Sequence, residues 1–384
     1  MSRKYCSIGM GDWVEVGNTG APDGTPVVNG DVYPCCPGWL LDKDGNDGYV
    51  FGNLFKESWE EVWNGKKAKS FRESILSGDF TYCNDGVCPH LQNVHSNPNV
   101  GSEDSAPAVR KIEDIELLYK ERGEHHRNII ENNLVTMKHA PMVVKLDYDK
   151  SCNLSCPSCR VDLQTANREE LVLAQKIQNY LIESVIKRGA KKLYVTGTGD
   201  PFGSKTLRSF LLDFKKENFP SVEGIRLHTN GILWTKELWS KMEGLHGVVN
   251  DAEVSIDAGT KETYEKIRRG GDWDILMENL LYIPTQVNWF GLSMVVQKTN
   301  YQEIPHLIKL RQRLIESTGN KNIYLYFSKI TDWKTYSKET YEELAVWKSN
   351  HIEHKKFLKI LNENINKNDW QDRFIGTNMT ELLI

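Results

Sequence analysis

Three closely spaced cysteines, Cys152, Cys156 and Cys159, are the residues whose types and spacing most directly suggest chemistry. They follow an alternating segment, residues 143–149, that is typical of a β-strand. Thiolates suit an iron–sulfur cluster, and three of them leave one iron of a cubane without a protein ligand. The spacing therefore predicts a cluster with an open iron, where a small molecule can bind. The alternative is structural zinc, which would need a fourth cysteine or histidine from elsewhere in the chain.

The elements that must position these cysteines are strand and helix patterns that alternate from residue 143 onward. Further strands are expected at 192–196, 225–229, 252–256, 290–296 and 323–327. Helical patterns occupy 169–188, 206–214, 236–242, 262–267, 274–281 and 304–315, and a last long helix is expected within 340–361. Alternating units imply a parallel α/β sheet, either open and doubly wound or closed into a partial TIM-type barrel. In both architectures the ligand binds at the carboxyl ends of the strands.

Polar and glycine residues follow these strand ends. Taken singly, each has a plain structural explanation, because glycine and Asn-Gly form turns and Ser or Asp caps helices. Thr198, Gly199, Asp200, His228, Asn230, Ser255 and Asp257 lie at or just after the ends of three of these strands.

Together these motifs resemble the radical S-adenosylmethionine (radical SAM) superfamily, whose signature is C-x3-C-x2-C. The resemblance implies a (β/α)6 partial barrel over residues 141–335, in which Cys152, Cys156 and Cys159 hold a SAM-binding 4Fe–4S cluster. Residues 198–200 resemble the family's GGEP motif, with Asp200 replacing the glutamate that holds the SAM amine. Arg160, next to the cluster, would either tune the cluster's charge or form a surface salt bridge.

The stretch from Ser255 to Gly271 resembles the family's "SxDG…YExIRRGG" sequence. By this likeness Ser255 and Asp257 address the ribose hydroxyls of SAM. Arg268, rather than its neighbour Arg269, pairs with the carboxylate, since a guanidinium offers bidentate donors and stays charged. The resemblance also places His228 and Asn230 facing the cofactor, and Val296 against the adenine.

The other five cysteines, Cys6, Cys35, Cys36, Cys83 and Cys88, all precede the barrel. Their sequence context, "GxVYPCC … GN … SWEEVWN … FR … C … CP", resembles the SPASM/twitch domain of radical SAM maturases, which surrounds an auxiliary 4Fe–4S cluster. The implied ligands are Cys6, Cys35, Cys83 and Cys88. Cys36 in place of Cys35, or His90 as a ligand, are the alternatives. The polar, glycine-rich composition predicts a poor core that a cluster would cross-link.

The resemblance divides the chain into an auxiliary-cluster domain (1–100), a linker and bridging helix (101–140), the barrel, and a C-terminal helical segment (336–384) that packs on the barrel. The linker is expected at 97–107 and the helix within 112–133. The module usually follows the barrel, whereas here it precedes it.

The net charge of -4 gives no reason to expect nucleic acid as a partner. No apolar run approaches a membrane span or a signal peptide, so a soluble, cytoplasmic protein is expected, with cysteines that bind metal rather than form disulfides.

The family resemblance implies that reductive cleavage of SAM gives a 5′-deoxyadenosyl radical, which abstracts a hydrogen from substrate. The expected electron donor is a flavodoxin or ferredoxin. The first choice of substrate is a peptide or protein side chain, and oxidation or epimerisation of a carbohydrate or amino sugar is the alternative. The alternative from a different functional class is that the protein is a non-catalytic metal-binding scaffold.

Overall fold

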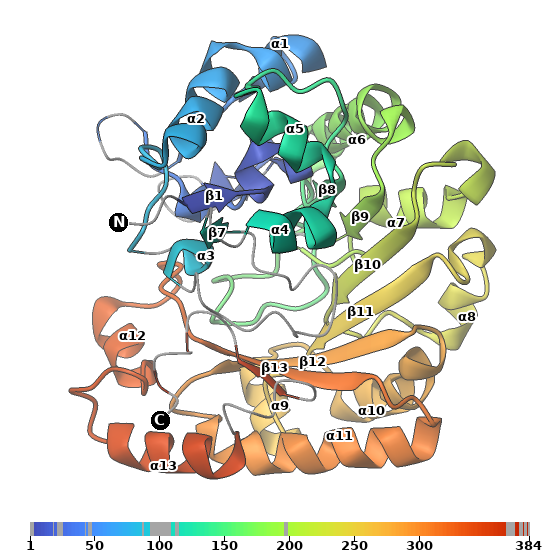
Figure 1. The fold of residues 1–384 in the computed structure, drawn as a ribbon. Helices are drawn as coiled ribbons and strands as arrows, with labels where there is room; N and C mark the ends of the chain where they lie inside the picture. Colours follow the sequence, from blue (N-terminus) through green and yellow to red (C-terminus); the bar gives the residue numbers. More distant parts are fainter. Residues whose placement is uncertain are drawn as a thin grey trace.

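The computed structural model describes residues 4–17, 19–20, 26–42, 44, 48–86, 88–92, 109–111, 115–195, 199–365, 373–375, 379 and 382. The predicted linker at 97–107 and Thr198 lie outside these residues. The ribbon shows long strands at the centre, with helices of the second half of the chain along the outer side (Figure 1).

Six parallel strands form the central part of the main sheet, in the order of the sequence. Each pairs with the next, from β8 to β13. They are β8 (Val143–Leu146), β9 (Lys192–Val195), β10 (Gly224–Thr229), β11 (Val249–Ser255), β12 (Trp289–Val296) and β13 (Ile323–Lys329). All six strands predicted from the sequence are therefore confirmed, and the sheet has the connectivity of a (β/α)6 partial barrel.

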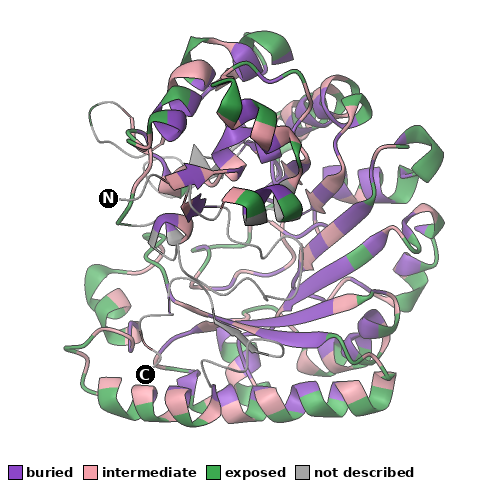
Figure 2. Ribbon diagram, viewed as in Figure 1, coloured by how far each residue is buried: buried purple, intermediate pink, exposed green. Residues whose placement is uncertain are grey.

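The connecting helices cover the outer face of this sheet. They are α6 (Arg168–Ser184), α7 (Lys205–Asp213), α8 (Lys236–Trp239), α9 (Lys261–Ile267), α10 (Trp273–Tyr282) and α11 (Ile304–Thr318). The start of α6 is fixed by a capping box, in which the Asn167 side chain accepts from the N–H groups of Glu169 and Glu170. Ile177 and Leu181, one turn apart on α6, are fully buried against the sheet. Figure 2 shows buried residues along the strands and exposed residues on the outer side of the helices.

The N-terminal segment joins the same sheet instead of forming a separate layer. β2 (Trp13–Val16) pairs in parallel with β8, β5 (Asp31–Tyr33) pairs antiparallel with β2, and β6 (Gly52–Asn53) pairs antiparallel with β5. Gly17, which follows β2, has φ +130°, and a Cβ there would lie 2.8 Å from the Cα of Tyr148. Only glycine allows the backbone segments at residues 17 and 148 to approach this closely. At the opposite edge, β14 (Arg373–Ile375) pairs in parallel with β13.

The rest of the N-terminal region packs above this edge of the sheet (Figure 1). It contains β1 (Lys4–Cys6), β3 (Thr19–Gly20), β4 (Pro26–Val27), α1 (Trp59–Asn64), α2 (Lys66–Ser77), α3 (Pro89–Gln92) and β7 (Val109–Lys111). β1 and β7 form an antiparallel pair. An aromatic cluster of Tyr49, Phe51, Phe71 and Tyr82 is buried within the region. The prediction of a poor core was therefore wrong, because large aromatic residues compensate for the many polar ones.

Two helices expected to be single are each divided. The bridging segment forms α4 (Ile115–Arg122) and α5 (His125–Glu131), because Gly123 between them has φ +111° and ends the first helix. The C-terminal segment forms α12 (Lys338–Leu344) and α13 (His354–Asn364). Between these two, Ala345 leaves helical geometry and is buried together with Val346.

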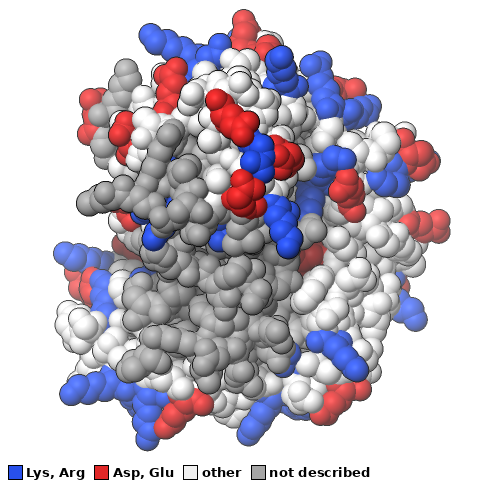
Figure 3. Space-filling view, in the orientation of Figure 1, with Lys and Arg blue, Asp and Glu red and all other residues white. Residues whose placement is uncertain are grey.

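Acidic and basic side chains are interspersed over the described part of the surface seen in Figure 3. Among the described helices, none combines the length and the apolar composition that a transmembrane span requires.

Candidate active site

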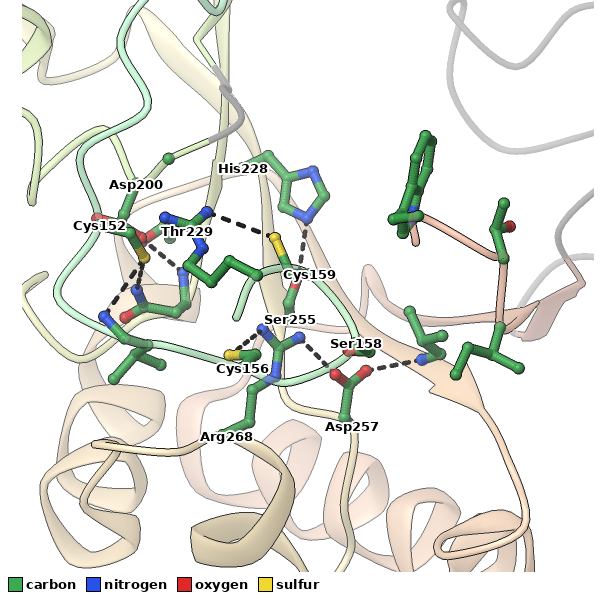
Figure 4. A pocket seen from close by; sticks show the side chains of 18 residues that line it. Cys152, Cys156, Ser158, Cys159, Asp200, His228, Thr229, Ser255, Asp257 and Arg268 are labelled. Carbon is green, nitrogen blue, oxygen red and sulfur yellow. Dashed lines mark hydrogen bonds and ion pairs between the residues drawn. The ribbon is translucent and has the colours of Figure 1, made fainter. Parts of the chain in front are cut away.

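The cysteine loop lies at the carboxyl end of β8, at one end of the barrel. The N–H of Cys152 donates to the carbonyl of Gln164 (3.0 Å), which closes the loop at its base. Cys159 and Arg160 both donate to the carbonyl of Cys156, at 2.9 and 3.0 Å, and so form a tight turn. The three cysteines converge on one pocket (Figure 4).

Each of the three sulfur atoms has a polar side-chain neighbour. The amide nitrogen of Asn230 lies 3.7 Å from Cys152 Sγ, Arg268 Nη1 lies 3.6 Å from Cys156 Sγ, and Arg160 Nη2 lies 3.4 Å from Cys159 Sγ. These donors stabilise thiolate charge, and two of them are cations. Arg160 also donates to the carbonyl of Lys150, so it is a buried part of the loop and not a surface ion pair.

Burial governs the protonation of the Cys152 and Cys156 thiols. It raises the pKa of Cys152 to about 11, with Asp200 adding to the effect and Arg160 opposing it. It also raises the pKa of Cys156, which Arg268 partly offsets. A metal must therefore displace protons to bind here, as thiolate ligation generally requires.

Arg268 and Asp257 form an ion pair on the pocket wall. Arg268 Nη2 lies 2.9 Å from Asp257 Oδ2, and the N–H of Val295 donates to the other carboxylate oxygen at 2.7 Å. Although burial alone would lower the pKa of Arg268, Asp257 and Cys156 raise it. Arg268 Nε is buried and has no hydrogen-bond partner among the described residues. A ligand carboxylate reaching this nitrogen would satisfy it, which fits the predicted carboxylate contact.

Asp257 itself is held in a strained backbone conformation, with φ +56°. The Asn300 side chain donates to the carbonyls of Asp257 (2.8 Å) and Val295 (2.9 Å) and so fixes this turn. Sequence analysis missed this role of Asn300. The only signal was an asparagine closely following a strand.

Asp200 lies at the pocket, but its carboxylate is engaged within the protein. Oδ2 accepts from the Thr229 hydroxyl (2.7 Å) and the Asn230 N–H (2.8 Å). Oδ1 accepts from the N–H groups of Phe202 (3.0 Å) and Gly203 (3.1 Å). Because four donors fill the capacity of a carboxylate, Asp200 joins the ends of β9 and β10. Its contact with the SAM amine stays a prediction.

Gly199 is required by close packing. A Cβ there would lie 2.2 Å from the carbonyl oxygen of Ser151 and 2.8 Å from that of Asp149. The turn after β9 therefore lies directly against the cysteine loop. Any side chain at this position would push the loop away.

His228 and Ser255 line the deeper wall of the pocket. His228 Nε2 lies 2.7 Å from the Ser255 hydroxyl and 3.4 Å from Glu253 Oε1. Burial lowers the pKa of His228, opposed by Glu253 and assisted by Arg226. The imidazole is therefore neutral near pH 7 and available as a hydrogen-bonding group.

A buried network of charged side chains continues from this wall into the barrel. Arg226 pairs with Asp251 (3.1 Å) and Glu253 (2.7 Å). Lys145 pairs with Glu15 (2.9 Å) and Asp147 (3.0 Å). Sequence analysis missed this network. The signal was present, since polar residues alternate in the strands, as Arg226 and His228 do, and alternate residues face the same side of a sheet.

Val296, the residue predicted to touch adenine, does not line the pocket, and its contact with adenine stays a prediction. Val296 is buried in the core at 1% exposure, whereas Val295 lines the pocket. Successive strand residues point to opposite faces, so a shift of one position exchanges core and pocket. The structure brings the other described candidates together: Cys152, Cys156, Cys159, Gly199, Asp200, His228, Asn230, Ser255, Asp257 and Arg268 all line the pocket.

The N-terminal cysteines gather in a second place. Burial raises the pKa of Cys35, and the neighbouring cysteines Cys83, Cys6, Cys36 and Cys88 raise it further. Cys6, Cys83 and Cys88 pack around a small apolar cluster that includes Val109. Cys36 has different neighbours: burial raises its pKa to about 11, Glu15 adds to the effect and Lys145 opposes it. Cys36 thus faces the charged network of the barrel. His90 packs edge-on against Trp39, with ring centroids 5.4 Å apart.

Comparison with known families agrees with this geometry. The model of the radical SAM superfamily matches residues 150–311. The SPASM model, described as an iron–sulfur cluster-binding domain, matches residues 27–89. The chain therefore carries a radical SAM domain, preceded by a SPASM domain. Radical SAM domains are those of enzymes that use SAM with a 4Fe–4S cluster and need a reductant.

Curated relatives are distant. An AdoMet-dependent heme synthase of Methanosarcina barkeri is 25% identical over 184 residues, 47% of this chain and 50% of its own. A GTP 3′,8-cyclase of Alkaliphilus metalliredigens is 24% identical over 148 residues, 38% of this chain and 44% of its own. A GTP 3′,8-cyclase of Rhizobium etli is 25% identical over 168 residues, 43% of this chain and 47% of its own. The match spans about half the length of these relatives.

Proposed function

We propose that the pocket binds SAM on a cluster held by Cys152, Cys156 and Cys159 and directs the resulting radical at a bound substrate. When bound and reduced, this cluster supplies the electron that cleaves SAM into methionine and a 5′-deoxyadenosyl radical. The single observation that carries the proposal is Arg268, whose guanidinium lies beside Cys156 and whose buried Nε has no hydrogen-bond partner among the described residues.

The residues of this chain have separable tasks in the proposal. Arg268 binds the SAM carboxylate, and Asp257 keeps the guanidinium in place through their ion pair. Ser255 and His228, already hydrogen-bonded to each other, present polar groups to the ribose. Gly199 allows the turn after β9 to pack directly against the cysteine loop. Val295 offers an apolar surface to the adenine.

Four N-terminal cysteines, Cys6, Cys35, Cys83 and Cys88, would hold one auxiliary 4Fe–4S cluster. Cys35 is chosen over Cys36 because the charged neighbours that shift the pKa of Cys36 are Glu15, Lys145 and Asp147, whereas those of Cys35 are other cysteines. The auxiliary cluster would accept an electron from the substrate radical or organise the docking surface. A flavodoxin or ferredoxin would reduce the SAM-binding cluster.

For the substrate we propose a peptide or protein side chain, supported by the resemblance of the N-terminal sequence motifs to the SPASM/twitch domain of radical SAM maturases. A polar small molecule, such as a carbohydrate or amino sugar, is the second candidate. It is favoured by the charged network beneath the pocket and by relatives named for GTP cyclisation.

The test is anaerobic turnover of reduced, iron–sulfur-loaded protein with SAM. Methionine and 5′-deoxyadenosine are expected in equal amounts, measured by mass spectrometry. Protein that holds zinc instead of iron, or loaded protein without either product, would contradict the proposal. Product formation is then compared with short peptides and with amino sugars, because the true class of substrate should raise it above the uncoupled background.

A further inference from the structure

Asp12 and two adjacent histidines form a cluster outside both cysteine sites. Asp12 precedes β2, and His125 and His126 begin α5. Nε2 of His126 lies 2.9 Å from Asp12 Oδ1, and Nε2 of His125 lies 3.3 Å from the same oxygen. One ligand atom from each of the three residues lies within 4.8 Å of the others.

The two contacts to Asp12, at 2.9 and 3.3 Å, are close to the separations of atoms that share a metal ion. Zinc binds imidazole nitrogen and carboxylate oxygen at roughly 2.0–2.2 Å in tetrahedral geometry, which places its ligand atoms roughly 3–3.5 Å apart. Two imidazoles and one carboxylate form a ligand set that suits divalent zinc, iron or cobalt. The three residues come from segments more than 100 positions apart, as the His126–Asp12 separation of 114 residues shows. The fold therefore assembles the set.

An outer hydrogen bond orients one of the imidazoles. Nδ1 of His126 lies 2.8 Å from the hydroxyl of Tyr5, which is buried. Metal-binding histidines almost always hydrogen-bond through their second ring nitrogen, which fixes the tautomer and the ring orientation. With Nδ1–H donating to Tyr5, Nε2 of His126 is left as a lone pair directed at the Asp12 side.

The cluster is enclosed but has one accessible side. The His126 side chain is 0% exposed and that of Asp12 5%, whereas that of His125 is 29% exposed. His139 stands beside His125, with ring centroids 5.0 Å apart. Its Nε2 is buried without a hydrogen-bond partner among the described residues. A metal-bound water would satisfy this nitrogen.

We propose that Asp12, His125 and His126 bind a divalent transition-metal ion, separate from both iron–sulfur clusters. The rival explanation is a relay without metal, in which Tyr5 donates to His126 and both histidines donate to Asp12. The relay explains the contacts of His126, but it gives His139 Nε2 no partner.

The test uses the iron–sulfur-loaded protein and Zn²⁺ as the probe, titrated against a chromophoric chelator. The wild type should bind one equivalent of Zn²⁺ tightly. His125→Ala should weaken this binding by more than the roughly 10- to 100-fold that loss of an outer hydrogen bond costs, and Tyr5→Phe should weaken it within that range. His306→Ala, at an exposed histidine on α11, is the matched control and should bind Zn²⁺ like the wild type.

His125 is partly exposed, so its removal is compatible with folding, and melting temperatures without Zn²⁺ verify this. Zn²⁺ should raise the melting temperature of the wild type but not of His125→Ala, since a ligand stabilises only the state that binds it. No tight equivalent in the wild type would overturn the proposal. Equal Zn²⁺ binding by wild type and His125→Ala would also overturn it, because the ion would then occupy cysteines.

Discussion

The two cysteine sites differ in what surrounds the sulfur atoms. At the barrel site, each sulfur atom has a side-chain hydrogen-bond donor beside it. Two of these three donors are the guanidinium groups of Arg160 and Arg268. In the N-terminal domain, the Cys6 sulfur accepts hydrogen bonds from the backbone N–H groups of Gly9 and Ile8, and apolar residues pack around it. Cluster potentials depend on hydrogen bonds to sulfur, net charge and solvent exposure. The comparison indicates one site built for ligand exchange at an exposed end and one built for enclosure.

The largest expected effect comes from removing one cysteine from each site. Cys156→Ala should abolish SAM cleavage, since the open-iron cluster loses a ligand. Cys83→Ala should lower total iron by roughly half while uncoupled SAM cleavage continues, because a closed cluster needs four ligands. Iron analysis and 5′-deoxyadenosine assays measure both.

Cys36→Ala is the matched control for the N-terminal variant. It should leave iron near the wild-type content, because Cys36 faces Lys145 and Glu15. Loss of iron in Cys36→Ala but not in a Cys35→Ala variant would reverse the assignment of the two neighbours.

A second comparison sets Arg268 against Arg269. Arg268→Ala should weaken SAM binding roughly 10- to 100-fold, as expected when a charged hydrogen bond worth about 1.5–3 kcal/mol is lost. Arg269 is exposed and donates to the Ser155 hydroxyl (2.9 Å) outside the pocket, so Arg269→Ala should bind SAM almost normally. Equilibrium binding with iron content as a control distinguishes them, and equal losses would refute the carboxylate assignment.

Arg160 sharpens the electrostatic side of the comparison. Arg160→Gln removes a positive charge next to Cys159 and should lower the midpoint potential of the barrel cluster, on the order of 59 mV for a tenfold change in a one-electron equilibrium. The potential of the auxiliary cluster should not move. Redox titration followed by electron paramagnetic resonance resolves the two; a common shift would show that Arg160 acts on the whole fold.

The smallest effect concerns pH. Burial holds the pKa of His228 below its usual value, so as pH falls below about 6.5 the unfolded chain gains a proton that the folded protein resists. Stability from neutral His228 is therefore present above that pH and declines below it. His228→Gln should flatten this part of the melting temperature profile. If the melting temperature of the variant still falls as steeply with decreasing pH, other groups cause the acid destabilisation.

Much of the barrel could be predicted because its strands and helices carry strong local patterns. The six strands follow apolar runs, and Gly199 and Arg268 follow strand or helix ends at motif spacing. Site residues were harder to predict where their positions depend on pairing between segments that are distant in the sequence. Whether Val295 or Val296 lines the pocket depends on one residue of register, and the two valines have the same hydrophobicity.

Other features depend on contacts that no single segment encodes. The saturation of Asp200 requires the ends of β9 and β10 to meet. The insertion of β2 beside β8 joins positions near 13 and 143, and it removed the expected separation between domain and barrel sheets. Each of the two predicted helices is interrupted by a local feature. Gly123, with its positive φ, ends α4, and the buried turn at Ala345 and Val346 ends α12.

The parallel pairing of β2 with β8 has a mechanical consequence. Cys35 closely follows β5 and Cys152 follows β8, and both strands pair with β2, so a cysteine of each proposed cluster site is attached to the same sheet. A hinge between them would have to break backbone hydrogen bonds. Electron exchange between the clusters would thus occur across a fixed span, and loops, instead of a swinging domain, must admit the substrate.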